Sequence, residues 1–169
     1  MRRLIAAIAV LLLSVAVASA QNYMVIDSER VFKSLAEYNN ALDEIERLSK
    51  IYQDKVDEKF SEVETLYNNY IAVRASLSDY SRQQREQQIL KLEKEATEFQ
   101  EAIFGTEGEI MKRRMELIQP IQKRVFEAIE SYAKQMGYDI VIDISANPTV
   151  LYYSKSVDHT ERIIEALNK

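Results

Sequence analysis

Residues 42–77 read LDEIERLSKIYQDKVDEKFSEVETLYNNYIAVRASL, and this stretch decides the fold. With Leu42 taken as heptad position a, nine of the eleven a and d positions are apolar or aromatic. Apolar residues spaced alternately by three and four are typical of a helix that buries one narrow seam against a partner helix. The eleven positions are Leu42, Ile45, Ser49, Tyr52, Val56, Lys59, Val63, Leu66, Tyr70, Val73 and Leu77.

The seam stops at residues 76–81, where Ser and Asp favour a turn and a new helix start. A second register then follows and predicts a return helix, although Thr106 and Arg113 make its seam more polar. Roughly forty residues on each side give helices of about 60 Å, so we expect an antiparallel hairpin with its reversal near residues 77–81. Two separate helices in a globular bundle are the alternative. The second register is Ile89, Leu92, Ala96, Phe99, Ile103, Thr106, Ile110, Arg113 and Leu117.

Three residues that disfavour helix lie inside the expected return helix. Gly105 and Gly108 each cost about 1 kcal/mol relative to Ala in a helix interior. They predict either a flexible point in the arm or a local packing accommodation. Pro120 removes a backbone donor, so we expect a kink there, with the helix resuming to Met136. Gly137 is placed to end that helix in a left-handed cap.

The chain begins with the features of an export signal. Met1-Arg2-Arg3 is positively charged, Leu4–Val17 is apolar, and Ala18-Ser19-Ala20 has the small-x-small form of a cleavage site. We therefore expect residues 1–20 to be a signal peptide that is cleaved after about Ala20, with an uncleaved membrane anchor as the alternative. The mature protein would then work outside the cytoplasm.

The composition argues against several classes of function. Without Arg2 and Arg3, 20 basic residues stand against 27 acidic ones, and a net charge of −7 disfavours nucleic-acid binding. No Cys and a single His, His159, disfavour disulfides and structural metal sites. The three glycines form no phosphate-binding loop, and we interpret His159 as a cap or surface residue. We expect no catalytic residue, no metal and no cofactor.

Both ends of the mature chain predict a small body with β-structure. We expect strands at residues 23–26, 138–144 and 149–153, the last two as a hairpin around a turn at Pro148. Asp27 or Ser28 should cap a short helix, Asp79 or Ser81 the return helix, and residues 158–161 should form a capping box. The fold class is thus α+β, mostly α. Residues 21–35 and 120–169 form an oligomerisation body, and residues 36–119 form the arm, a coiled-coil hairpin. Open strand edges and a small core favour oligomerisation.

Over its full length the chain resembles the Skp/OmpH family of periplasmic chaperones. The order of strand, long helical hairpin, strands and final helix carries the resemblance more specifically than any single piece. The matching pieces are the export signal, Tyr23–Phe32 with Ala36-Glu37-Tyr38, Pro120-Ile121, Ala128-Ile129 through Gly137–Asp143, and Asp158–Glu161 with Ala166-Leu167-Asn168.

The resemblance implies a homotrimer whose β body is shared among three chains and whose three arms enclose a cavity. It also implies a periplasmic holdase that binds unfolded outer-membrane proteins without ATP. The best-known members are basic, whereas this chain is acidic. We therefore do not carry over lipopolysaccharide binding, and the net charge argues against contact with anionic membranes.

Large apolar residues outside the seam suggest where clients bind. A two-helix hairpin does not bury them, so they either contact clients or pack between arms or against the body. We expect packing for Met111 and Ile118, near the body. Further out, the candidates for client binding are Phe60, Tyr67, Leu90 and Phe104, while Ile51 and Ile71 also lie off the seam. An exported coiled-coil structural or adaptor protein of the cell envelope is the alternative function, and it needs a polar outer face or one fixed partner.

Overall fold

The computed structural model describes residues 22–168, so the expected signal peptide lies outside the described residues. The chain forms two compact units: the arm, residues 36–121, and the body, which combines residues 22–35 with residues from 122 onward. Long helices dominate, and two strands form one small sheet. The predicted fold class, α+β and mostly α, is therefore confirmed.

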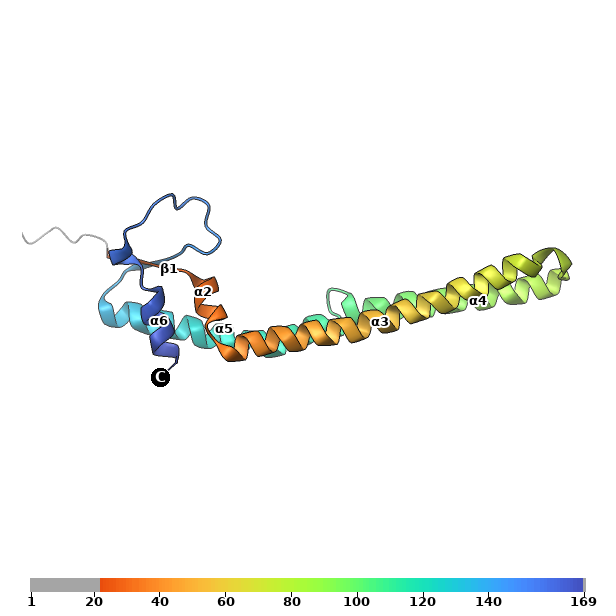
Figure 1. Ribbon diagram of the computed structural model, residues 1–169, viewed down its shortest axis with the longest axis horizontal. Helices are drawn as coiled ribbons and strands as arrows, with labels where there is room; N and C mark the ends of the chain where they lie inside the picture. Colours follow the sequence, from red (N-terminus) through yellow and green to blue (C-terminus); the bar gives the residue numbers. More distant parts are fainter. Residues whose placement is uncertain (1–21, 169) are drawn as a thin grey trace, which may run out of the picture. The chain divides into compact units, whose positions relative to one another are not determined.

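The arm is an antiparallel helical hairpin. Helix α3 spans Ala36–Val73, the 3-10 turn η1 spans Arg74–Ser76, and the chain returns through α4, Asp79–Phe104. Figure 1 shows α3 and α4 lying alongside each other. The 38 residues of α3 correspond to a helix of about 57 Å, close to the predicted length. Ser78 caps α4, since its side chain accepts a hydrogen bond from the Ser81 N–H at 3.2 Å. The sequence predicted Asp79 or Ser81 as this cap, which is wrong, because the observed cap lies one residue before Asp79 and three before Ser81.

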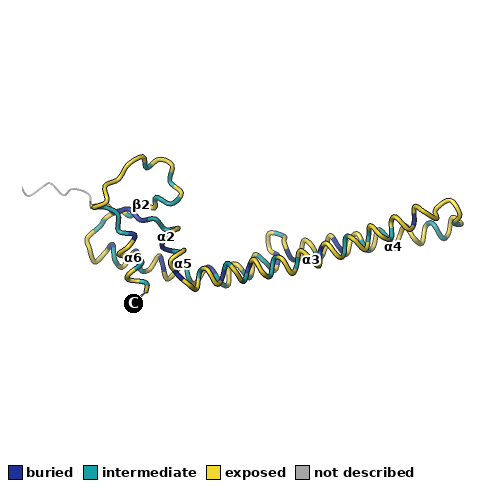
Figure 2. The backbone as a smooth tube through the Cα atoms, in the orientation of Figure 1, coloured by how far each residue is buried: buried dark blue, intermediate teal, exposed yellow. Residues whose placement is uncertain are grey.

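The buried residues of the arm follow the predicted seam. Ile45, Val56 and Tyr70 on α3 are at most 4% exposed, and Ala96 and Ile103 on the return helix are also buried. In Figure 2 buried positions recur along the hairpin between exposed ones. The arm therefore has one narrow core, and most of its remaining surface faces solvent.

The polar seam residue Arg113 has a partner across the hairpin. It lies in α5, Glu109–Met136, whose first part completes the arm. Its Nε and Nη2 atoms donate to Glu44 Oε1 at 3.0 and 2.6 Å, and its Nη1 atom donates to Glu116 Oε2 at 3.0 Å. The seam at this position is thus closed by an ion pair instead of an apolar contact.

The expectation that the return helix continues through Gly105 and Gly108 is wrong. Helix α4 ends at Phe104, and the Gly108 N–H donates to the Gly105 carbonyl at 2.9 Å in a tight turn before α5. This turn stands out from the hairpin in Figure 1. A Cβ atom at Gly105 would lie 2.4 Å from the Glu101 carbonyl oxygen, and one at Gly108 would lie 2.5 Å from that of Ile103. Both positions therefore require glycine in this conformation.

The register between α3 and the returning part of the arm is the same before and after this turn. In an antiparallel pair, facing residues keep a constant sum of residue numbers. This sum is nearly equal for the pairs Tyr70–Glu86 and Lys59–Phe99, whose second members precede the turn, and for the pair Glu44–Arg113, whose second member follows it. The turn therefore occupies about the same axial length as the helix that it interrupts.

Helix α5 continues through Pro120 and ends in the cap that the sequence predicts. Gly137 has a φ of 75°, and the Tyr138 N–H donates to the Ala133 carbonyl at 2.9 Å. This bond spans the last turn as in a Schellman motif, which needs a left-handed residue that glycine provides without strain. The chain is thereby turned out of the helix just before the second strand.

The sheet of the body consists of two parallel strands. Strand β1, Tyr23–Ile26, pairs with β2, Ile140–Asp143, in the register Tyr23↔Ile140. The predicted hairpin is wrong, because residues 149–153 form no strand. The Asn147 side chain accepts from the Thr149 N–H at 3.1 Å and holds a local turn there.

β1 is the centre of the body core. Its second edge is occupied because the Val25 carbonyl accepts from the His159 N–H at 3.0 Å. Three consecutive β1 residues are buried, which is typical of a strand covered on both faces. The buried residues of the body are Met24, Val25, Ile26, Val31, Leu35, Val125, Ile129, Ala133, Thr160 and Ile163.

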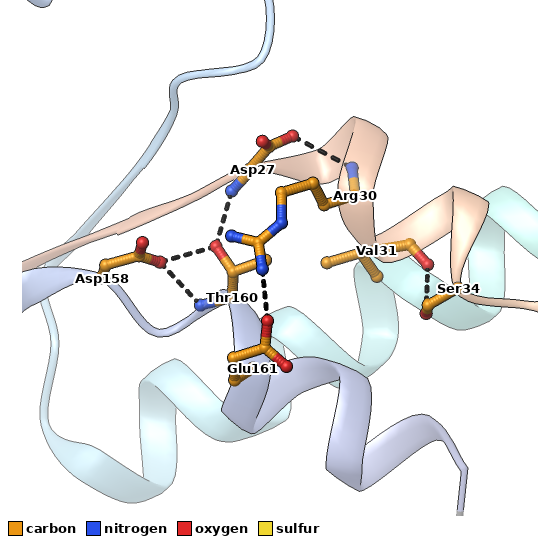
Figure 3. A network of polar contacts seen from close by, with 7 residues as sticks. All are labelled: Asp27, Arg30, Val31, Ser34, Asp158, Thr160 and Glu161. Carbon is orange, nitrogen blue, oxygen red and sulfur yellow. Dashed lines mark hydrogen bonds and ion pairs between the residues drawn. The ribbon is translucent and has the colours of Figure 1, made fainter. Parts of the chain in front are cut away.

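One buried hydroxyl joins two segments of the body that lie far apart in the sequence. Thr160 begins α6, Thr160–Leu167, and is fully buried. Its hydroxyl accepts from the Asp27 N–H at 2.9 Å and donates to Asp158 Oδ1 at 2.6 Å, as Figure 3 shows. Asp27 also caps α2, Ser28–Lys33, by accepting from the Arg30 N–H at 3.0 Å, which confirms its predicted role.

The predicted capping box at residues 158–161 is wrong, because α6 begins at Thr160 with His159 at its N-cap. Asp158 accepts from the Thr160 N–H at 3.0 Å, but Glu161 forms an ion pair with Arg30 instead of returning to the backbone. Partial burial acts to raise the pKa of Asp158, yet hydrogen bonds from Thr160 and the nearby charge of Arg30 lower it overall. A short 3-10 turn, η2, Lys155–Val157, precedes this site.

We expect Thr160→Val to destabilise the body by about 2 kcal/mol, because it leaves the Asp27 N–H and the Asp158 carboxylate without their buried partner. Urea unfolding followed by circular dichroism measures this loss. Glu161→Gln is the matched control, since it weakens an exposed ion pair that contributes less than about 1 kcal/mol. Equal effects of the two substitutions would contradict the role given to Thr160.

Candidate functional site

Three large exposed side chains near the reversal of the arm lie on one face. Tyr67 and Ile71 are four residues apart on α3, so they share a side of that helix. They are 51% and 49% exposed, and Leu90 of α4 is 64% exposed. These three side chains belong to no core within the hairpin.

The three residues border a single shallow hollow between α3 and α4. Its volume is about 430 Å³, large enough for one or two side chains of a bound polypeptide. We call it the tip hollow. It is lined by Tyr67, Tyr70, Ile71, Arg74, Glu86, Ile89, Leu90 and Glu93.

A chain of polar contacts fixes part of the lining. The Tyr70 hydroxyl donates to Glu86 Oε1, and the Arg74 Nε atom donates to the Tyr70 oxygen at 3.2 Å. The hydrogen bond to Glu86 is the main reason that the pKa of Tyr70 is raised. Because Arg74 and Glu86 meet at the same hydroxyl, their opposite charges compensate each other locally. The tip hollow is thus preorganised in the free chain.

The structure brings together two of the four predicted client-binding residues. Tyr67 and Leu90 line the tip hollow. Phe60 lies seven residues before Tyr67 on the same side of α3 and is half-buried. Phe104 is 37% exposed and ends α4 beside Gly105, so it does not line the hollow.

The two packing predictions near the body have different outcomes. Ile118 is 8% exposed and packs with Ala41 and Ile45 of the same arm, so the hairpin itself buries it and the expectation that it packs between arms or against the body is wrong. Met111 is 42% exposed in the single chain, so its packing between arms stays a prediction. The off-seam residue Ile51 is also exposed, but helical geometry places it on the opposite side of α3 from Tyr67.

The sequence did not predict the polar part of the tip hollow. Arg74 lies four residues after Tyr70, so that contact follows from helical spacing. Glu86 lies on the other helix, and its contact with Tyr70 requires the register of the hairpin. The sequence prediction selected apolar residues outside the seam, so it did not include either charged side chain.

The single histidine has structural contacts. His159 Nδ1 and Nε2 each lie 2.9 Å from a tyrosine hydroxyl, those of Tyr132 and Tyr138. Asp158 bonds to Thr160, which leaves no catalytic triad among these neighbours. Between residues 22 and 168 the acidic and histidine side chains form no group of three suited to a metal ion. In the same part of the chain, no helix has the length and apolar character needed to span a membrane.

Comparison with known proteins adds one finding. The family model described as outer membrane protein (OmpH-like) matches residues 22–167, which covers both the arm and the body. No curated protein sequence matches the chain.

We expect the tip hollow to tolerate polar substitution without loss of stability. Leu90→Ser should change the free energy of unfolding by less than about 0.5 kcal/mol, because exposed side chains contribute little to stability. Val56→Ala, at a position 2% exposed in the arm core, should cost about 1 to 2 kcal/mol. Chemical denaturation of both variants tests this. A large loss for Leu90→Ser would show that this face packs against another part of the assembly.

Proposed function

This chain belongs to the OmpH-like family of outer membrane proteins, and from that premise we propose that it is an ATP-independent periplasmic holdase. It binds unfolded outer-membrane proteins in a cavity between helical arms and prevents their aggregation. The observation that carries the proposal is the exposed apolar face of the arm around Tyr67, Ile71 and Leu90. Soluble proteins seldom leave such a face uncovered unless it binds something.

The geometry of the arm supports holding rather than tight binding. The tip hollow is shallow and admits only part of a client, so one arm binds weakly. Several arms around one unfolded chain would add their weak contacts into avidity. Each contact can be released alone, and the client can be handed on without nucleotide hydrolysis.

The decisive assay measures light scattering as a denatured outer-membrane β-barrel protein is diluted into buffer with the purified mature chain and no ATP. We expect suppressed aggregation. A double variant, Tyr67→Ser with Leu90→Ser, should bind at least about five-fold more weakly, because two apolar contacts are lost. Tyr80→Ser is the matched control, since Tyr80 is 72% exposed and lies outside the tip hollow.

The outcomes separate the proposed function from its alternative. Failure of the unaltered chain to suppress scattering at several-fold excess would favour an envelope spacer or adaptor. Suppression that the double variant retains in full would instead move the client site away from the tip hollow, with Phe60 and Phe104 as the next residues to replace.

The body supports assembly into an oligomer, which we propose is a homotrimer. Within residues 22–168 β2 has no strand on its outer edge, and Ile140 is 46% exposed there. Leu151 and Tyr152 are 94% and 86% exposed in the segment that follows β2. Open edges and bare apolar side chains are covered in stable proteins, and a second copy of the chain supplies matching groups.

We expect Leu151→Asp with Tyr152→Asp to lower the oligomer mass, because charges at a buried interface are costly. Size-exclusion chromatography with multi-angle light scattering measures the mass of the wild-type and the variant. Tyr80→Asp, at an exposed position in the arm, should leave the mass unchanged. A monomeric wild-type chain would exclude the shared body.

The turn at Gly105 and Gly108 gives the arm a place to bend, and we propose that it adapts the cavity to clients of different size. Pro120 is a second candidate, since it removes one hydrogen bond from α5. On α3, which faces this turn, no residue between Ile45 and Val56 is buried. Few packing contacts would therefore be lost if the arm bends at this level.

Replacing both glycines with Ala should convert the turn into helix, because a Cβ atom at either site collides with a carbonyl oxygen and the pairing register already suits a continuous helix. We expect stronger helical circular dichroism and weaker binding of large clients than of small ones. Unchanged binding of both client sizes by such a straightened variant would contradict the hinge.

A further inference from the structure

The negative charge of the mature chain is concentrated in the arm. Residues 36–121 contain 18 Asp and Glu against 12 Lys and Arg, so the arm carries −6 of the net −7. The excess is greatest on the return side, where residues 93–109 contain six Glu and one Lys. That lysine, Lys94, lies 3.6 Å from Glu98 and is therefore already paired.

The tip hollow adjoins this acidic stretch. Arg74 and Glu86 compensate each other through Tyr70, which leaves Glu93 as the remaining charge in the lining. Among the described residues the Glu93 carboxylate has no hydrogen-bond or ion-pair partner, and the residue is exposed. The nearby Arg85 lines an adjoining hollow, which shares Tyr70 and Ile89 with the tip hollow. An occupant of the tip hollow thus meets apolar side chains and one uncompensated negative charge.

The spacing of the apolar residues suits an extended polypeptide. Tyr67 and Ile71 are separated by four helical residues, about 6 Å along the axis, while every second residue of a strand repeats at about 6.8 Å. Two apolar side chains from one face of an extended segment can therefore reach both residues. A Lys or Arg beside them has a long enough side chain to reach a carboxylate on the rim.

We propose that the tip hollow selects extended, unfolded segments in which apolar residues are accompanied by Lys or Arg, with Glu93 as the cation-facing group. This inference rests on the proposed holdase function and specifies the class of client segment. The apolar contacts supply affinity, and the acidic stretch from Glu93 to Glu109 attracts cationic segments to the hollow. Acidic segments of equal apolar content are disfavoured by the same charges.

The preference is electrostatic and depends on salt. At 0.1 M ionic strength charges act over about 10 Å, which spans the hollow and the neighbouring turns of α4, and at 1 M only about 3 Å. We expect a cationic segment to bind about ten-fold more tightly than an acidic one at low salt, with the difference largely lost near 0.5 M.

The test uses the oligomer of the full mature chain and three labelled peptides of equal length. Each has the same apolar residues at alternate positions, with Lys, Gln or Glu at the others. Fluorescence anisotropy gives their affinities in low and high salt. We expect the order Lys, Gln, Glu in low salt. Equal binding of all three overturns the inference but leaves the holdase standing, whereas no binding of any peptide, together with no suppression of aggregation, removes the holdase itself.

Two variants locate the selectivity. Glu93→Gln and Glu95→Gln change the net charge equally, but Glu95 lies outside the hollow and pairs with Lys91 at 3.7 Å. We expect Glu93→Gln to reduce the preference for the Lys peptide about two- to three-fold, a change typical of one exposed charge, and Glu95→Gln to leave it unchanged. An equal effect of both variants would assign the preference to the whole arm and overturn the role of Glu93.

Discussion

The narrow seam between α3 and its return helix is the constraint on which the arm depends. Two helices in contact bury one stripe each, and here that stripe holds residues such as Ile45, Val56 and Ala96. Large apolar residues that point away from this stripe stay exposed unless another chain covers them. The exposure of Tyr67, Ile71 and Leu90 is therefore a direct consequence of building a long structure from only two helices. A compact bundle of the same sequence length would have buried them.

The body is small and must hold together segments that are distant in the sequence. Its two strands, residues 23–26 and 140–143, lie far apart in the sequence, so the short stretches of backbone that flank them cannot hold them together locally. Backbone pairing joins the two strands directly, and the buried Thr160 hydroxyl joins the segment after β1 to the start of α6. The parallel pairing also leaves the segment around Leu151 without a sheet partner, which a three-stranded antiparallel arrangement would have provided. The parallel pairing of β1 with β2 thus orders the core and also leaves exposed the surface that we propose for assembly.

The sequence predicted those parts of the fold that local patterns determine. Heptad spacing located the hairpin, and Gly137 and Asp27 marked helix ends, because each depends on residues within one or two turns. It failed where the outcome depends on distant contacts. Residues 149–153 have strand-forming composition, but β1 pairs instead with β2 on one edge and with His159 on the other. Gly105 and Gly108 predicted a weak point, yet only their clashes with neighbouring carbonyls show why the helix is interrupted completely.

The candidate site shows the same division. Tyr67 and Leu90 were found because an apolar residue off the seam is visible in one helix alone. The charges around them required the register between two helices, which brings Glu86 to Tyr70 and leaves Glu93 unpaired. That difference matters for function. Apolar exposure alone predicts a surface that takes any unfolded chain, whereas apolar exposure beside uncompensated carboxylates predicts a surface with a preference. In the proposed oligomer several arms would act together, so even a modest preference per site would be multiplied across the assembly. On this proposal the acidity of the arm contributes to its selectivity.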